Sequence, residues 1–275
     1  MTKYLSWKSD ARPCKATARS LTLDSLKVRL DDKPARGYVC LPGDTRSEID
    51  EALSLKLVDD ATEFLFVEKD PDTARRIEHL YKHMDYDLYI DPVSQLKLPA
   101  NKRYNCFNLD TCSMLGMEIP VTLNNLFYNS TDSVEDVASV AVNVHLTDRL
   151  KCNAMSIVDA IIDSSDYDMP YDPADVDVIG TYKANHKTTA NIRRLLQSYK
   201  LACCDFISTD VSVYVYRDSI KGPPMCTVIS KLVRHNDKKL ADKQNRKFNE
   251  MRLVHEDQYP GSRYRRSTQL LLDGA

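Results

Sequence analysis

Strand-like runs alternate with helical patterns along most of this chain, and this alternation limits the fold more than any other feature. Strands that alternate with helices favour a parallel sheet with helices on both of its faces. The last two strand-like runs are separated by Lys221-Gly222-Pro223-Pro224, which predicts that they pair as an antiparallel hairpin. The runs that we assign to strands are 37–41, 64–67, 87–91, 104–110, 137–146, 211–216 and 226–233.

The pattern predicts one α/β domain over residues 36–236, with a doubly wound, mainly parallel seven-stranded sheet that ends in a C-terminal antiparallel hairpin. Residues 1–35 are expected to form an N-terminal arm, of which the polar and basic residues 1–19 are irregular. Residues 237–275 form a basic C-terminal extension, which we interpret as a helix followed by a flexible tail.

Composition places the chain among soluble globular proteins. Hydrophobic residues make up 43% and charged residues 28%, which are ordinary values. No run approaches the 18 apolar residues of a membrane-spanning helix, and the polar N-terminus does not resemble a secretory signal. None of the eight cysteines forms a CxxC pair, so no metal site is predicted. Reduced thiols without a signal favour a cytoplasmic location.

Positive charge is concentrated near the C-terminus. The whole chain has a net charge of -2, but residues 231–266 hold eleven Lys or Arg against five Asp or Glu. A basic segment on an acidic body indicates an anionic partner, and nucleic acid is the partner that we expect. A solvated helix face is the alternative interpretation. The candidate nucleic-acid-binding residues are Lys238, Lys239, Arg246, Arg263, Arg265 and Arg266.

Acidic residues stand where several of the predicted strands end. Glu68 follows the second strand, Asp91 ends the third, and Asp110 ends the fourth, within Asn108-Leu109-Asp110-Thr111-Cys112-Ser113. Open α/β sheets bind ligands at the carboxyl ends of their strands. This spacing of acids therefore suggests a nucleotide-like cofactor, and it does not by itself name a reaction.

The strand order and terminal hairpin resemble those of the class I S-adenosylmethionine-dependent methyltransferases, over roughly residues 36–233. The resemblance is closest to a divergent branch with an Asp-Pro-Phe-Gly or Asp-Phe-Cys-Gly sequence after strand four, of which 108–113 looks like a variant. It implies a Rossmann-like methyltransferase fold, S-adenosylmethionine as cofactor, and methyl transfer to a base nitrogen of a nucleic acid.

The resemblance also implies individual roles. Glu68 would accept hydrogen bonds from the ribose hydroxyls, and Asp91 would contact the adenine amino group. Asp110 would face the methyl donor and the target nucleophile, while Arg149 would clamp a phosphate or a substrate carbonyl. The residues that would hold the cofactor are Leu41, Gly43, Asp44, Glu68 and Asp91.

A second interpretation stays open. Only one glycine, Gly43, stands where the family has a glycine-rich loop. This favours a catalytically inactive protein of the same fold, viral in origin, that serves as a nucleic-acid- or protein-binding module. The acids at 68, 91 and 110 favour the enzyme.

Overall fold

The computed structural model describes residues 13–43, 45–115, 117–148, 177–179, 186–217 and 224–258. The elements in chain order are α1 (Pro13–Arg29), β1 (Gly37–Cys40), α2 (Ser47–Ser54), β2 (Glu63–Val67), α3 (Pro71–Leu80), β3 (Tyr86–Tyr89), the short helix η2 (Val93–Gln95), β4 (Tyr104–Leu115), α4 (Glu118–Asn124), the π-helical turn η3 (Asn125–Asn129), η4 (Thr131–Ser133), β5 (Val134–Asp148), β6 (Asp177–Ile179), α6 (His186–Ala202), β7 (Phe206–Tyr216), β8 (Met225–Arg234) and α7 (Lys238–Gln258).

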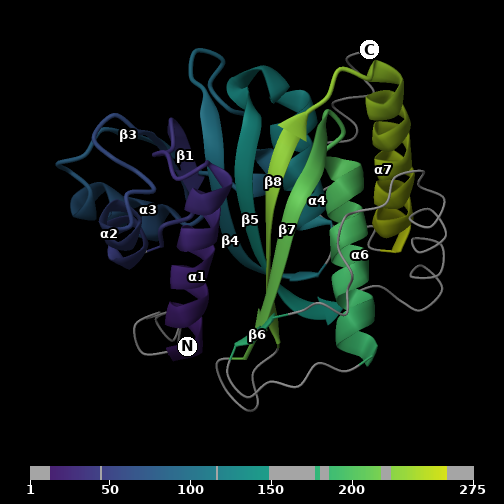
Figure 1. Cartoon of the computed structure of the whole chain (residues 1–275), viewed down its shortest axis with the longest axis horizontal. Helices are drawn as coiled ribbons and strands as arrows, with labels where there is room; N and C mark the ends of the chain where they lie inside the picture. Colours follow the sequence, from purple (N-terminus) through teal and green to yellow (C-terminus); the bar gives the residue numbers. More distant parts are fainter. Residues whose placement is uncertain are drawn as a thin grey trace.

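The strands form one sheet in the order β3-β2-β1-β4-β5-β8-β7-β6 (Figure 1). The first five strands in this order are parallel, and β8 runs antiparallel to both β5 and β7. The order 3-2-1-4-5 is that of doubly wound nucleotide-binding sheets. The predicted doubly wound, mainly parallel Rossmann-like sheet and its antiparallel hairpin are therefore confirmed. The predicted number of strands is wrong, because the three-residue strand β6 pairs with β7 and makes eight.

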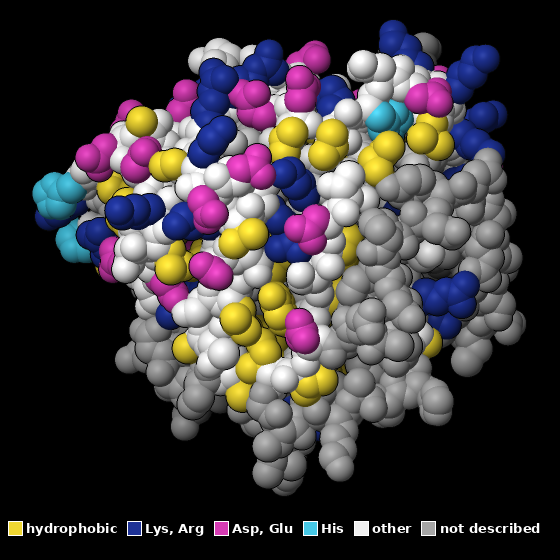
Figure 2. Space-filling view, in the orientation of Figure 1, with side chains coloured by type: hydrophobic (Ala, Val, Ile, Leu, Met, Phe, Trp, Pro, Cys, Tyr) yellow, Lys and Arg dark blue, Asp and Glu magenta, His cyan; other side chains and the backbone are white. Residues whose placement is uncertain are grey.

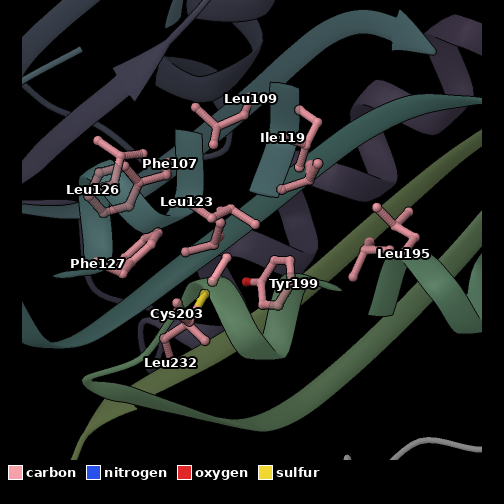
Figure 3. Packing of buried hydrophobic residues seen from close by; sticks show 14 of the residues in the cluster. Phe107, Leu109, Ile119, Leu123, Leu126, Phe127, Leu195, Tyr199, Cys203 and Leu232 are labelled. Carbon is pink, nitrogen blue, oxygen red and sulfur yellow. The ribbon is translucent and has the colours of Figure 1, made fainter. Parts of the chain in front are cut away.

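Helices cover both faces of the sheet. On one face α1, α2 and α3 pack on a core that includes Leu26, Ile49 and Ile77, and α1 crosses in front of the strands (Figure 1). On the other face α4, α6 and α7 pack on the larger core. Figure 3 shows part of that core, where Phe107 of β4 meets Phe127. The two rings make an edge-to-face contact with their centroids 5.1 Å apart.

The N-terminal part of the chain differs from the prediction. Residues 13–19, expected to be irregular, begin helix α1. The helix is fixed to the sheet by the buried residues Leu23 and Leu26. At its C-terminal end the Arg29 guanidinium donates to Asp210 Oδ1 at 2.9 Å and to Ser212 Oγ at 2.8 Å, both on β7. These contacts make α1 part of the layered body.

Strand β4 is longer than predicted. It does not end at Asp110 but continues to Leu115 and stays paired with β5, with a register shift between Asp110 and Ser113. Such a shift marks a β-bulge, which bends the strand locally. Asp110 therefore lies inside a strand, although beyond the last residue of the neighbouring β1. Among the described residues, no helix has both the length and the apolar character that crossing a membrane requires.

Candidate functional site

The chain order of the sheet reverses at β1, which lies between β2 and β4. A reversal of this kind leaves a crevice at the carboxyl ends of the strands, and open α/β proteins bind ligands there. Cys40, the last residue of β1, pairs with Phe66 of β2 and with Asn108 of β4. Glu68 and Asp110 each come two residues after these partners. The two acids therefore flank the loop that follows β1, about 10 Å apart if each strand adds about 4.8 Å.

Glu68 stands directly after β2, as predicted. Its backbone N–H donates to the carbonyl of Tyr89 at 3.0 Å, which continues the β2–β3 pairing by one residue. Its Oε1 atom accepts from the backbone N–H of Asp70 at 2.9 Å. Asp70 in turn caps helix α3 by accepting from the backbone N–H of Thr73. One carboxylate oxygen of Glu68 is thus held in place by the start of α3.

The loop after β1 contains a backbone conformation that favours glycine. Gly43 has φ +64°, and a Cβ atom added there would meet nothing within 4 Å. The predicted cofactor role of Leu41 and Gly43 requires space for a ligand next to the backbone, and Gly43 has such space. The loop is anchored by the residue that follows α3, because the Tyr81 hydroxyl donates to the carbonyl of Thr45 at 3.0 Å. Asp44 lies outside the described residues.

Asp91 lies in the exposed turn between β3 and η2. Its strand forms the outer edge of the sheet, next to β2 and one strand further from the reversal at β1. The turn is tied back by the Tyr89 hydroxyl, which donates to the carbonyl of Gln95 at 2.9 Å. Asp91 is therefore placed beside Glu68 along the carboxyl edge, and not beside Asp110.

Asp110 is paired with the N-terminal helix. Its Oδ2 atom lies 3.2 Å from Lys15 Nζ of α1, and both side chains are about four-fifths buried, with exposures of 22% and 16%. One turn further along α1, Arg19 Nε donates to Glu51 Oε2 of α2 at 2.7 Å. The start of α1 therefore reaches the carboxyl end of β4 through Lys15, which the sequence pattern did not predict.

A buried acid at this site was missed by the sequence analysis. Glu48, in the first turn of α2, is 9% exposed. Its Oε1 accepts from the Tyr38 hydroxyl at 2.7 Å and from Asn108 Nδ2 at 2.9 Å. Burial raises the pKa of Glu48 to about 7, and the charge of Asp110 acts in the same direction, against the two hydrogen bonds and Arg19. A carboxyl with a strongly perturbed pKa, close to the point where the strand order reverses, is a candidate for a functional role.

The basic residues of the C-terminal extension are only partly described. Lys238, Lys239 and Arg246 are exposed on α7, whose opposite side buries Phe248 and Met251 in the core. Lys and Arg side chains gather along the edge of the molecule where α7 lies (Figure 2). Arg149, Arg263, Arg265 and Arg266 lie outside the described residues. Within the described ranges, no group of three or more His, Cys, Asp or Glu could hold a metal ion.

Comparisons with known proteins give structural likeness only. No protein-family model and no curated protein sequence matches the chain. Among solved structures, M. jannaschii TYW2 in complex with AdoMet aligns at 10% identity with a TM-score of 0.44, covering 77% of this chain and 77% of that one. The O-methyltransferase TomG from Streptomyces achromogenes, in complex with SAM, aligns at 15% identity with a TM-score of 0.42, covering 80% of each chain.

A third similar structure is magnesium protoporphyrin IX methyltransferase from Synechocystis PCC 6803 with bound SAH. It aligns at 11% identity with a TM-score of 0.42, covering 81% of this chain and 84% of that one. At these identities and TM-scores the likeness bears on neither activity nor substrate. The fold of this chain follows from its own strand order.

Proposed function

We propose that this protein transfers a methyl group from S-adenosylmethionine to a base nitrogen of a nucleic acid. The observation that carries the proposal is the placement of Glu68 and Asp110 on either side of the loop after β1, where the strand order reverses. Ligands of open α/β sheets bind at this position. Glu68 follows β2 and Asp110 lies on β4, and each stands two residues after the partner of Cys40, the last residue of β1.

The residues present fit such a cofactor. Glu68 has one oxygen fixed by Asp70 and a second that suits a ribose hydroxyl. Gly43 offers backbone with open space beside it. The cofactor supplies a methyl group already activated on a sulfonium, so the chain needs mainly to orient the acceptor and exclude water. Asp110 would accept a hydrogen bond from the acceptor amine and direct its lone pair, once Lys15 has moved from the carboxylate.

We expect Glu68→Ala to weaken S-adenosylmethionine binding at least tenfold, because a charge-assisted hydrogen bond to the ribose, which contributes about 1.5–3 kcal/mol, would be lost. Isothermal titration calorimetry on the full chain measures this directly. Glu78→Ala is the matched control, since Glu78 is an exposed acid on α3 away from the sheet edge. The proposal would be refuted if the wild-type protein gave no heat of binding at high micromolar S-adenosylmethionine. It would also be refuted if Glu68→Ala and Glu78→Ala bound the cofactor with equal affinity.

A second candidate function is that of a binding module without catalysis. Two observations favour it: the loop after β1 has a single glycine, and Asp110 is engaged by Lys15. This candidate predicts that nucleic acid binds while S-adenosylmethionine does not. The same calorimetric titration therefore separates the two functions.

The exposed Lys and Arg residues of α7 support the nucleic-acid part of the proposal. We expect Lys239→Glu with Arg246→Glu to weaken binding of a single-stranded oligonucleotide. The slope of log affinity against log salt should fall by about 1.4, since each lost phosphate contact on a single strand removes about 0.7. Fluorescence anisotropy at several salt concentrations measures both. The control is Lys82→Glu with Lys97→Glu, an equal charge change at exposed positions elsewhere. An unchanged slope would refute a role for α7.

A further inference from the structure

A row of polar side chains continues from Asp110 across the face of the sheet that α1 covers. Asp110 pairs with Asn143 of β5, and Asn143 pairs with Thr227 of β8. Paired residues of neighbouring strands point to the same face. That face is the one covered by α1, because Ala141 and Ile229, each two residues along the same strands, pack against α1 in its core. The three polar residues therefore lie side by side under the helix.

Two members of this row have buried polar atoms without a hydrogen-bond partner. Asn143 is 8% exposed and Thr227 is 2% exposed. Asn143 Nδ2 donates to the Tyr216 hydroxyl at 3.0 Å, but Asn143 Oδ1 and Thr227 Oγ1 find no partner within the part of the chain that the structure describes. A tyrosine hydroxyl can donate or accept, so either orientation of the amide leaves one end unpaired. Buried polar groups of this kind require an explanation, and a role in binding or catalysis is one.

The part of α1 above this row is attached more weakly than the rest of the helix. Its C-terminal half is fixed by the fully buried Leu23 and Leu26 and by the hydrogen bonds of Arg29. Its N-terminal half is held by the ion pairs of Lys15 and Arg19 and by a hydrogen bond from Ser20 to Glu51. Its apolar contacts there are those of the small side chains Cys14 and Ala18. These contacts bury less apolar surface than the side chains of Leu23 and Leu26 do, so they stabilise the packing of the helix less. The first turns of α1 can therefore lift while the second half stays packed.

We propose that the row Asp110–Asn143–Thr227 is a binding site for a planar heteroaromatic ring that bears an amino group, the chemistry of adenine, cytosine and guanine. The ring would enter when the first turns of α1 lift and Lys15 leaves Asp110. Its amino group donates to Asp110, while its other edge atoms pair with the free end of the Asn143 amide and with the Thr227 hydroxyl. The row spans about 10 Å, two strand spacings of about 4.8 Å, which accommodates a ring of this size. The assignment of this ring as the methyl acceptor rests on the proposed function.

The central test is Thr227→Val, which replaces the unpaired hydroxyl by a methyl group of similar shape. Removing a buried unsatisfied hydroxyl should keep or raise the melting temperature, by up to about 4 °C. If the hydroxyl is kept for a ligand, the same change should weaken cytidine binding at least fivefold. The matched control is Ser139→Ala, because Ser139 is also fully buried with an unpaired hydroxyl on β5, four residues before Asn143. It should leave the affinity unchanged.

Ligand binding is measured on the full chain without S-adenosylmethionine, by calorimetry with cytidine, adenosine, guanosine and uridine. We expect the three amino-bearing nucleosides to bind more tightly than uridine, and Lys15→Ala to strengthen their binding severalfold because it frees Asp110. Single-stranded oligonucleotides with one cytosine or one uracil distinguish a base within a strand from a free nucleoside. Equal affinity for the cytosine and uracil ligands, or no binding of any of them even to Lys15→Ala, would overturn the inference. Those outcomes are independent of the cofactor titration, so either proposal can fail alone.

Discussion

Replacing Glu48 with Gln is expected to remove a pH dependence of stability that the wild-type protein shows between about pH 4.5 and 7. Burial raises the pKa of the Glu48 carboxyl from its ordinary value of 4.5 to about 7. The folded protein therefore binds this proton more tightly than the unfolded chain does. The resulting stabilisation is complete below pH 4.5, is lost as the pH rises through 7, and amounts to about 3 kcal/mol at 1.36 kcal/mol per pH unit.

The groups around Glu48 determine how closely the variant reproduces the protonated acid. Tyr38 and Asn108 both donate to Oε1, and the amide oxygen of Gln can accept both bonds. Asp110 raises the pKa by repulsion, and Arg19 lowers it by attraction. The buried thiols of Cys40 and Cys106 have pKa values raised by burial, so they stay neutral in this range. The neutral amide therefore stands in for the uncharged carboxyl at every pH.

Urea denaturation at pH 4.5, 6, 7 and 8 measures the effect. The free energy of unfolding of Glu48→Gln should match that of the wild type near pH 4.5 and exceed it by about 3 kcal/mol at pH 8. Glu78→Gln, at an exposed position, controls for the loss of one negative charge. If Glu48→Gln and Glu78→Gln show the same pH profile as the wild type, Glu48 is not the buried acid that its geometry indicates.

Most of the layered fold could be predicted because its central strands and helices have recognisable local sequence patterns. A strand that is buried on both faces is an uninterrupted apolar run, as at Phe64–Val67, and α3 begins with a proline after its capping Asp70. The alternation of such runs then fixes a parallel sheet. The extension of β4 past Asp110 could not be predicted, because Thr111-Cys112-Ser113 resembles a turn when its partner strand β5 is not considered.

The candidate site was predicted only where its residues stand at strand ends. Glu68 falls at the expected edge because the end of an apolar run is visible in the sequence. Glu48 stands in the first turn of α2, where an acid is common because it favours the start of a helix. Its burial depends on Tyr38, ten residues before it, and on Asn108, sixty residues after it. Contacts over such separations form only in the folded chain, and the same holds for the ion pair of Lys15 with Asp110.

Substituting Gly37 with Ala is expected to destabilise the protein by about 2–4 kcal/mol, because the new methyl group would collide with backbone atoms of β4. A Cβ atom at Gly37 would lie 2.4 Å from the carbonyl oxygen of Arg103 and 3.0 Å from Cα of Tyr104. Neither atom can turn away as the end of a flexible side chain could. The strands β1 and β4 would have to separate at the first residue of β1, next to the pairing of Tyr38 with Cys106.

Gly43→Ala is the control that separates a collision from a conformational preference. Gly43 has φ +64° but open space around it, so alanine there should cost only about 1–2 kcal/mol, the penalty for a left-handed backbone. Gly43→Asn should cost less still, since asparagine tolerates that conformation. Urea denaturation of the three variants ranks the two causes. If Gly37→Ala costs no more than Gly43→Ala, then β1 and β4 are not packed as closely as described, and the crevice that Glu68 and Asp110 flank would need a different geometry.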